Sequence, residues 1–190
     1  MKPILIIVVV LAVITAGFWF IYGGEKTKAP TIITNFTECV EAGNPIMESY
    51  PRQCRTEDGR TFTESIGNEL EKTDLIRLTS PRPNNTIESP LIITGEARGY
   101  WFFEASFPVF LVNWDGLIIA QGIATAKDEW MTEDFVPFEA TLEFSTEEGS
   151  IPGMDNVFYK NNGALILKKD NPSGLPEHDD ALEIPIFFEL

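Results

Sequence analysis

The chain has 190 residues, of which 29 are acidic and 14 are basic, so its formal net charge is −15. This acidic balance argues against binding to nucleic acid and against adsorption onto anionic lipid. It also favours solubility of an exposed domain, and the length allows one modest domain with accessory segments.

Residues 1–24 are strongly apolar, and the twenty positions from Pro3 to Tyr22 carry no charge. A helix of that length spans about 30 Å, the thickness of the hydrocarbon core of a bilayer. Because Lys2 precedes the run and aromatic residues gather at its far end, we expect a single-pass anchor whose amino end stays in the cytoplasm. The rest of the chain then lies outside the cytoplasm. A cleaved signal peptide is the alternative, although no Ala-x-Ala pattern follows a short apolar run.

Residues 25–34 are expected to form a tether, and residues 35–64 form a small segment that contains both cysteines. In an exported protein, Cys39 and Cys54 at this spacing predict a disulfide, which would stabilise the segment by about 3 kcal/mol. Thiols kept for redox or metal chemistry are disfavoured, since no CxxC spacing is present. The string QCRTEDGRTF resembles one patch of Kazal-type protease inhibitors but lacks their six-cysteine framework.

Residues 65–74 are polar and predict a linker with a helical turn. In the region that follows, strict alternation over 135–146 predicts a half-buried strand with Phe138, Ala140, Leu142 and Phe144 on one face. Pro185 lacks an amide donor and indicates an edge position or a bulge. Seven apolar stretches separated by turn residues predict short strands at 75–81, 89–99, 107–116, 117–126, 135–146, 163–169 and 181–190.

The predicted fold of residues 75–190 is therefore all-β, an immunoglobulin-like β-sandwich of about seven strands without a core disulfide. Three strings carry a family resemblance: SPLIITGEARGYWFFEASFPVFLVNWDG, EWMTEDFVPFEATLEF and GALILKKDNPSGLPEHDDALEIPI. They resemble the bacterial spore germination immunoglobulin-like domain family over residues 75–190. The resemblance implies the same sandwich fold on an exported or membrane-anchored bacterial protein. It implies a role in interaction, because the family offers no catalytic motif to transfer.

No catalytic pattern is found in the sequence. The one histidine, His178, lies in a polar stretch, and there is no nucleophile elbow, phosphate-binding loop or dinucleotide fingerprint. We therefore expect that the protein is not an enzyme. Calcium is the single candidate cofactor, because four carboxylates in one loop offer hard oxygen ligands; a solvated turn explains the same residues. These candidates are Asp170, Glu177, Asp179 and Asp180.

The stretch GEARGYWFFEASF contains four consecutive aromatic residues, at positions 100–103. Strand alternation would direct Trp101 and Phe103 to one side and Tyr100 and Phe102 to the other. One pair would then close the end of the core, and the other would form a partner-binding patch, with Arg98 and Glu104 paired across the turn. The candidate binding residues are Arg98, Tyr100, Trp101, Phe102 and Glu104.

The function predicted from the sequence is that of a membrane-anchored bacterial surface protein. It would present an acidic immunoglobulin-like domain to another envelope protein or to a cell-wall polymer, in envelope or germination processes. A self-assembling structural subunit of the envelope is the main alternative. An enzyme and a Kazal-like protease inhibitor are lesser alternatives.

Overall fold

The computed structural model describes residues 32–147, 153 and 156–190. The chain divides into two compact units, the first ending at Thr63 and the second running from Glu64 to Leu190. The anchor expected over residues 1–24, and most of the expected tether, lie outside the described residues. Within the described part, no helix is long and apolar enough to cross a membrane.

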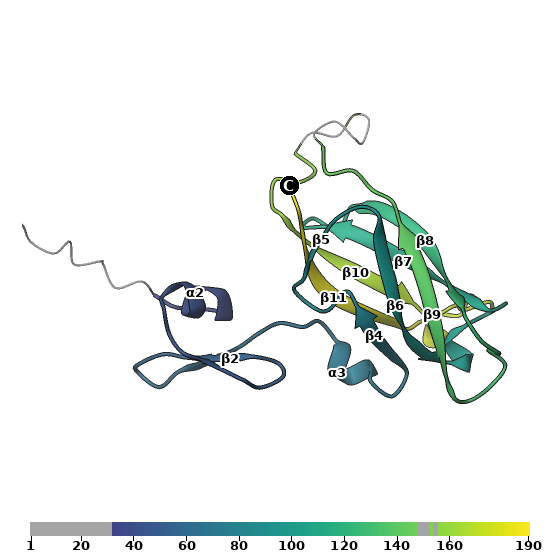
Figure 1. The fold of residues 1–190 in the computed structure, drawn as a ribbon, viewed down its shortest axis with the longest axis horizontal. Coiled ribbons are helices and arrows are strands. Elements are labelled where there is room, and N and C mark those ends of the chain that lie inside the picture. Colours follow the sequence, from purple (N-terminus) through teal and green to yellow (C-terminus); the bar gives the residue numbers. More distant parts are fainter. Residues whose placement is uncertain (1–31, 148–152, 154–155) are drawn as a thin grey trace, which may run out of the picture. The chain divides into compact units, whose positions relative to one another are not determined.

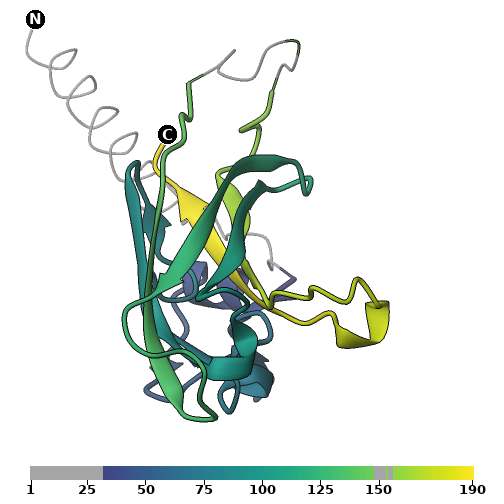
Figure 2. The same cartoon turned by 90° about the vertical axis from the view of Figure 1, so that its right-hand side faces the viewer.

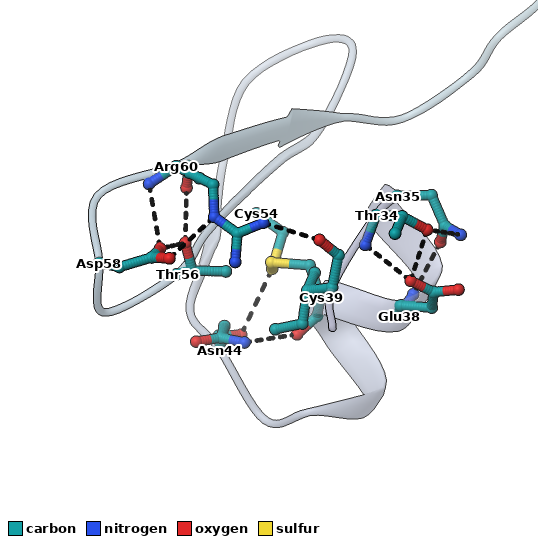
Figure 3. The surroundings of a disulfide bond; sticks show 10 residues. Thr34, Asn35, Glu38, Cys39, Asn44, Cys54, Thr56, Asp58 and Arg60 are labelled. Carbon is teal, nitrogen blue, oxygen red and sulfur yellow. Dashed lines mark hydrogen bonds and ion pairs between the residues drawn. A yellow bond between two sulfur atoms is a disulfide. The ribbon is translucent and has the colours of Figure 1, made fainter. Parts of the chain in front are cut away.

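The first unit consists of a short helix and a three-stranded antiparallel sheet. The helix is α2 (Phe36–Glu41), and the strands are β1 (Ile46–Met47), β2 (Gln53–Arg55) and β3 (Thr61–Thr63), in the order β1-β2-β3. The predicted disulfide is confirmed: it joins Cys39 of α2 to Cys54 of β2, with the Cα atoms 6.1 Å apart (Figure 3). Both cysteines are fully buried, and Thr56 is the one other buried residue in the described part of this unit.

Short polar contacts fix the helix start and the β2–β3 turn of the first unit (Figure 3). The side-chain oxygen of Asn35 accepts a bond from the Glu38 amide at 2.9 Å, which caps α2. The Glu38 carboxylate accepts bonds from the amide and hydroxyl of Thr34 at 2.7 and 2.8 Å, and these bonds lower the pKa of Glu38. In the turn, Asp58 accepts bonds from the Thr56 hydroxyl and, at 2.8 Å, from the Arg60 guanidinium.

The second unit contains the β-sandwich. Its first half comprises α3 (Glu69–Lys72), β4 (Ile76–Ser80), β5 (Thr86–Ile87), β6 (Leu91–Arg98), the 3-10 turn η1 (Gly99–Trp101) and β7 (Ser106–Asn113). Its second half comprises β8 (Ile118–Ala126), β9 (Phe135–Leu142), β10 (Asn162–Lys168), the 3-10 turn η2 (Pro176–His178) and β11 (Ala181–Phe188).

The strands follow the order β4-β6-β9-β8-β7-β10-β11-β5 and lie in two layers (Figures 1 and 2). One layer holds β4, β6 and β9, and the other holds β8, β7, β10, β11 and β5. The layers join where β8, paired with β7 along most of its length, also pairs with β9 at Thr125 and Ala126. The described residues thus give this unit eight strands rather than about seven. The additional strand, β5, has two residues and pairs in parallel with β11, and it is too short to produce an alternation in the sequence.

Alternate side chains of both layers fill the core, as the period-two pattern predicted. The Phe107 ring on β7 packs edge-on against the Phe138 ring on β9 in the other layer, with the two ring centroids 5.0 Å apart. Burying a side chain of this size contributes about 2–3 kcal/mol. The buried residues of β9 and β11 include Val136, Phe138, Ala140, Leu142, Leu182, Ile184, Ile186 and Phe188.

The Pro185 prediction agrees with the structure, and a tight turn joins β7 to β8. β7 and β8 form a hairpin in which Gly116 has φ of +80° and the buried side chain of Asn113 accepts bonds from the Asp115 and Leu117 amides at 3.1 and 2.9 Å. Pro185 lies on β11 opposite Ala164 of β10. On its other side β11 pairs with β5 only at Phe187 and Phe188, so the missing amide donor of Pro185 interrupts no bond to β5.

Residues 65–74 were expected to be a linker, but they belong to the second unit and bind its last strand. The Asn68 side chain donates to the Ala181 carbonyl at 2.9 Å and accepts from the Glu183 amide at 2.8 Å. Gly67 has φ of +70°, and a Cβ at this position would lie 1.8 Å from the Glu183 carbonyl oxygen. The segment therefore needs glycine to approach β11 so closely. The helical turn predicted here is α3.

Candidate functional site: an aromatic groove between loops

Three loops gather at one end of the sandwich, namely residues 99–105, 127–134 and 169–180. β7 runs antiparallel to both β8 and β10, so the start of β7 lies beside the ends of those two strands. Backbone bonds join the loops: the Gly99 amide donates to the Asp134 carbonyl at 3.2 Å, and the Asp170 amide donates to the Trp101 carbonyl at 3.1 Å. We call residues 99–105, 127–134 and 169–180 the loop end. Figure 2 shows residues 169–180, in yellow-green, projecting from the sandwich with their helical turn η2.

The aromatic stretch begins at a position that only glycine fits. A Cβ on Gly99 would lie 1.9 Å from the Thr132 carbonyl oxygen and 2.3 Å from that of Trp130. Arg98, just before it, donates to the carbonyls of Asp74 and Glu133 at 3.0 and 3.1 Å. Contacts with the Asp74 carbonyl and with the 127–134 loop therefore hold the backbone in place just before η1 begins.

The burial of the four aromatic residues differs from the predicted alternation. Trp101 and Phe102 are both buried, whereas Tyr100 is 51% exposed and Phe103 is 41% exposed. The reason is η1, because residues 99–101 form a helical turn and only Phe102 returns to extended backbone. Successive side chains in such a turn do not point to opposite sides. The exposed pair is thus Tyr100 and Phe103.

The expected pairing of Arg98 with Glu104 is not found. The Arg98 guanidinium bonds to the two carbonyls described above and lies over the Phe135 ring, with its central carbon 4.1 Å from the ring centroid. Glu104 instead helps to turn the chain, because Glu104 and Ala105 have φ of +49° and +61°. Phe103 and Ser106 close this turn through two backbone bonds of 2.9 and 3.1 Å.

A groove of about 360 Å³ separates the aromatic loop from the β10–β11 loop. We call it the aromatic groove. One side is formed by Tyr100, Phe102 and Phe103, and the other by Lys169, Asp170, Asn171, Pro172, Ser173 and His178. Tyr100 also lines a second hollow, of about 510 Å³, together with Gly99, Trp130, Met131, Thr132 and Glu133. One exposed ring therefore forms a wall of two adjoining hollows.

Hydrogen bonds within the loop hold the polar side of the aromatic groove in place. The Asn171 amide nitrogen donates to the Leu175 carbonyl at 2.8 Å and to the Asp179 carboxylate at 3.0 Å. The Ser173 hydroxyl donates to the Asn171 side-chain oxygen at 2.5 Å. The bond from Asn171 lowers the pKa of Asp179, and the nearby Lys168 ammonium at 3.5 Å lowers it further.

The four carboxylates considered for calcium do not gather into one site. Asp179 is held by Asn171 and Lys168, and Asp180 is paired with Lys72 at 2.5 Å. Across the described residues, no group of three or more acidic, histidine or cysteine side chains is placed to hold a metal ion. Asp170 lines the aromatic groove, whereas Glu177 belongs to η2.

Sequence reasoning identified the aromatic stretch and the acidic loop separately, but it did not place them together. It also missed Phe103 as an exposed aromatic residue, and it missed Trp130 and Met131. Met131 is largely exposed within the otherwise polar run KDEWMTED. A large apolar side chain in a polar loop was the one signal in the sequence that pointed to this part of the site.

The family model of the immunoglobulin-like domain of bacterial spore germination matches residues 75–158. Residues 75–158 carry this germination-type domain. The resemblance seen in the sequence is thus confirmed from β4 through β9, while β10 and β11 follow the matched range and complete the sandwich. No curated protein and no solved structure gives a significant match to the chain.

Proposed function

We propose that this protein is a membrane-anchored bacterial surface protein that binds a partner, without catalysis, through the loop end of its immunoglobulin-like domain. Three features support the proposal: the uncharged run over residues 3–22, the germination-type domain, and the acidic character of the chain. The partner is an envelope protein or an envelope polymer, in the cell envelope or in germination.

The observation that carries the proposal is the exposure of Tyr100 and Phe103 on a fixed backbone frame. Large aromatic side chains are usually buried, and they dominate binding energy where they are held ready at a surface. Loops joining the strands at one end of a sandwich form the binding surface of antibody variable domains. Here the frame is fixed by Gly99 and Arg98, so the rings need little ordering when a partner binds.

The test is photo-crosslinking in the membrane of living cells. A photoreactive phenylalanine analogue is placed at position 100 of the full chain and, as the matched control, at position 159. Tyr159 is 73% exposed and lies beside the β7–β8 hairpin, at the opposite end of the sandwich. We expect a defined adduct from position 100 that is absent from position 159. Equal labelling from the two positions, or none from position 100, would contradict the proposed function.

Self-association is a second candidate function, and the outer face of β8, β7, β10 and β11 favours it. Its apolar side chains alternate with core residues, and several lie opposite one another in register, as Pro108 and Ile123 do. These apolar residues are Pro108, Phe110, Val112, Ile118, Ile123, Ala164, Ile166, Pro185 and Phe187. Polar residues interrupt the face, because Gln121 lies opposite Phe110 and Glu183 lies opposite Ile166. A largely apolar face of this kind often marks a protein interface. Sedimentation of the detergent-solubilised chain tests it: self-association requires a dimer that Ile123→Glu dissociates, and a strictly monomeric wild type excludes it.

A further inference from the structure

We propose that the aromatic groove selects a cationic partner, namely an extended protein segment that carries lysine or arginine side chains. The inference rests on the proposed function and specifies the chemistry of the partner. It is drawn from the charge of the loop end, the unpaired carboxylate in the groove and the two hollows beside Tyr100.

The loop end is strongly acidic. Residues 99–105, 127–134 and 169–180 contain nine acidic residues and two lysines, so they carry a formal net charge of −7. A negative potential of this size attracts cationic segments and repels phosphate-rich polymers. Lys169 is the one lysine in the wall of the aromatic groove, and it does not reverse the sign of the surface.

One carboxylate in the groove is free to pair with a cation. The Asp170 side chain makes no hydrogen bond or ion pair with any described residue, in contrast to Asp179 and Asp180, which are paired with lysines. It lines the aromatic groove together with Tyr100 and Phe103. A guanidinium or ammonium group in the groove would thus meet a carboxylate and two aromatic rings.

The protein's own side chains show that its aromatic rings accept cations. Both Arg77 and Arg98 lie over the Phe135 ring, at 3.9 and 4.1 Å from its centroid. Lys160 similarly lies over the Trp114 ring at 5.1 Å. Such contacts gain strength where the cation is desolvated and a carboxylate lies nearby. Tyr100 and Phe103 offer the same kind of ring, and no cation of the described residues lies over either of them.

The paired hollows suit an extended segment. Tyr100 forms a wall of both the aromatic groove and the second hollow, so two pockets adjoin across one ring. In an extended chain, side chains two positions apart point to the same side and are about 7 Å apart. Two alternate side chains of one segment can therefore occupy the two hollows, of which one is lined by Asp170 and the other by Glu133.

The first experiment measures peptide binding to the full chain in detergent micelles by fluorescence anisotropy. The probes are a peptide of alternating arginine and serine and matched peptides in which glutamine or glutamate replaces arginine. We expect the arginine peptide to bind at least about tenfold more tightly than the glutamine peptide, and the glutamate peptide not to bind. Tyr100→Ser and Asp170→Asn should each weaken binding about threefold to tenfold.

Two control variants separate a site from general charge attraction. Glu143→Gln removes an exposed carboxylate that directly follows β9 and lies outside the loop end, and Tyr159→Ser removes an exposed ring at the opposite end. Neither should change the affinity for the arginine peptide. Equal weakening by Asp170→Asn and Glu143→Gln, or equal binding of the arginine and glutamine peptides, would overturn the inference.

The second experiment distinguishes this inference from the proposed function. Excess arginine peptide is added during photo-crosslinking from position 100, and we expect it to suppress the adduct while the glutamine peptide does not. An adduct that persists, or that is suppressed by uncharged cell-wall glycan fragments instead, would refute the cationic partner and leave the binding role standing. If no adduct forms from position 100, the proposed function fails. The affinities of the arginine and glutamine peptides then decide by themselves whether the aromatic groove prefers a cationic ligand.

Discussion

Trp101 is fully buried, yet its indole N–H has no hydrogen-bond partner among the described residues. An unpaired buried donor costs about 1–3 kcal/mol. The large apolar area of the indole offsets this cost, because an aromatic side chain of this size dominates the packing around it. Trp101 therefore acts as a core residue that supports the exposed Tyr100 next to it in the chain.

Substitutions at Trp101 test this balance. Trp101→Ala should lower the free energy of unfolding by about 3–5 kcal/mol, because it leaves a large cavity. Trp101→Phe should cost clearly less, since it removes the unpaired N–H together with part of the ring. Urea denaturation followed by circular dichroism measures both values. A loss from Trp101→Phe as large as that from Trp101→Ala would show that the indole N–H is satisfied in solution.

At the scale of elements, the β10–β11 loop is held by polar contacts rather than by a core. Asn171, Ser173, Asp179 and Lys168 form a connected set of bonds on the surface. Because these groups are exposed, each contact adds little to global stability. Their effect is local: they set the shape of the side of the aromatic groove that carries Asp170.

The shape of this loop should depend on pH through Asp179. Its folded-state pKa lies below the ordinary value of 3.8, so the contacts that favour its charged form are fully present above pH 3.8 and are lost as the pH falls through the lower folded value. Asn171→Ala removes the main cause of the shift and should raise the pKa of Asp179. Carboxyl carbon NMR measures both values, and an Asp179 that titrates at or above 3.8 in the wild type would contradict the loop geometry.

Sequence patterns predicted the elements whose signal is local. The alternation of Phe138, Ala140 and Leu142 defined β9, because the side-chain period of a strand lies within the strand itself. Nothing local marked β5 or the docking of Gly67, since their partners on β11 lie about a hundred residues away in the chain. For the same reason, the aromatic groove could not be predicted from the sequence. Each of its walls was a candidate in the sequence, but their contact depends on the strand order.

At the scale of the whole molecule, the two units hold together by different means. The part of the first unit that the structure describes has a disulfide and few buried residues, whereas the second unit has a continuous apolar core and contains no cysteine. Reduction should therefore affect the two units differently. The disulfide contributes about 3 kcal/mol in the chain-entropy account, which is large for so small a unit.

Hydrogen exchange of the full chain before and after reduction tests this difference. Amides within residues 36–63 should lose their protection when Cys39 and Cys54 are reduced, while those of β6, β7 and β9 keep theirs. The variant with Cys39→Ser and Cys54→Ser should behave as the reduced protein does. Retained protection in the first unit, or loss of protection in the second, would contradict the assignment of separate sources of stability.

The bonds of Asn68 to β11 have a consequence for the order in which the domain is built. They join residues 113 and 115 positions apart, so they link the beginning of the second unit to its last strand. A ribosome delivers the chain from its amino end, and β11 emerges after every other strand. The sandwich therefore cannot close until β11 has left the ribosome, and its apolar strand faces stay open to chaperones and proteases until then.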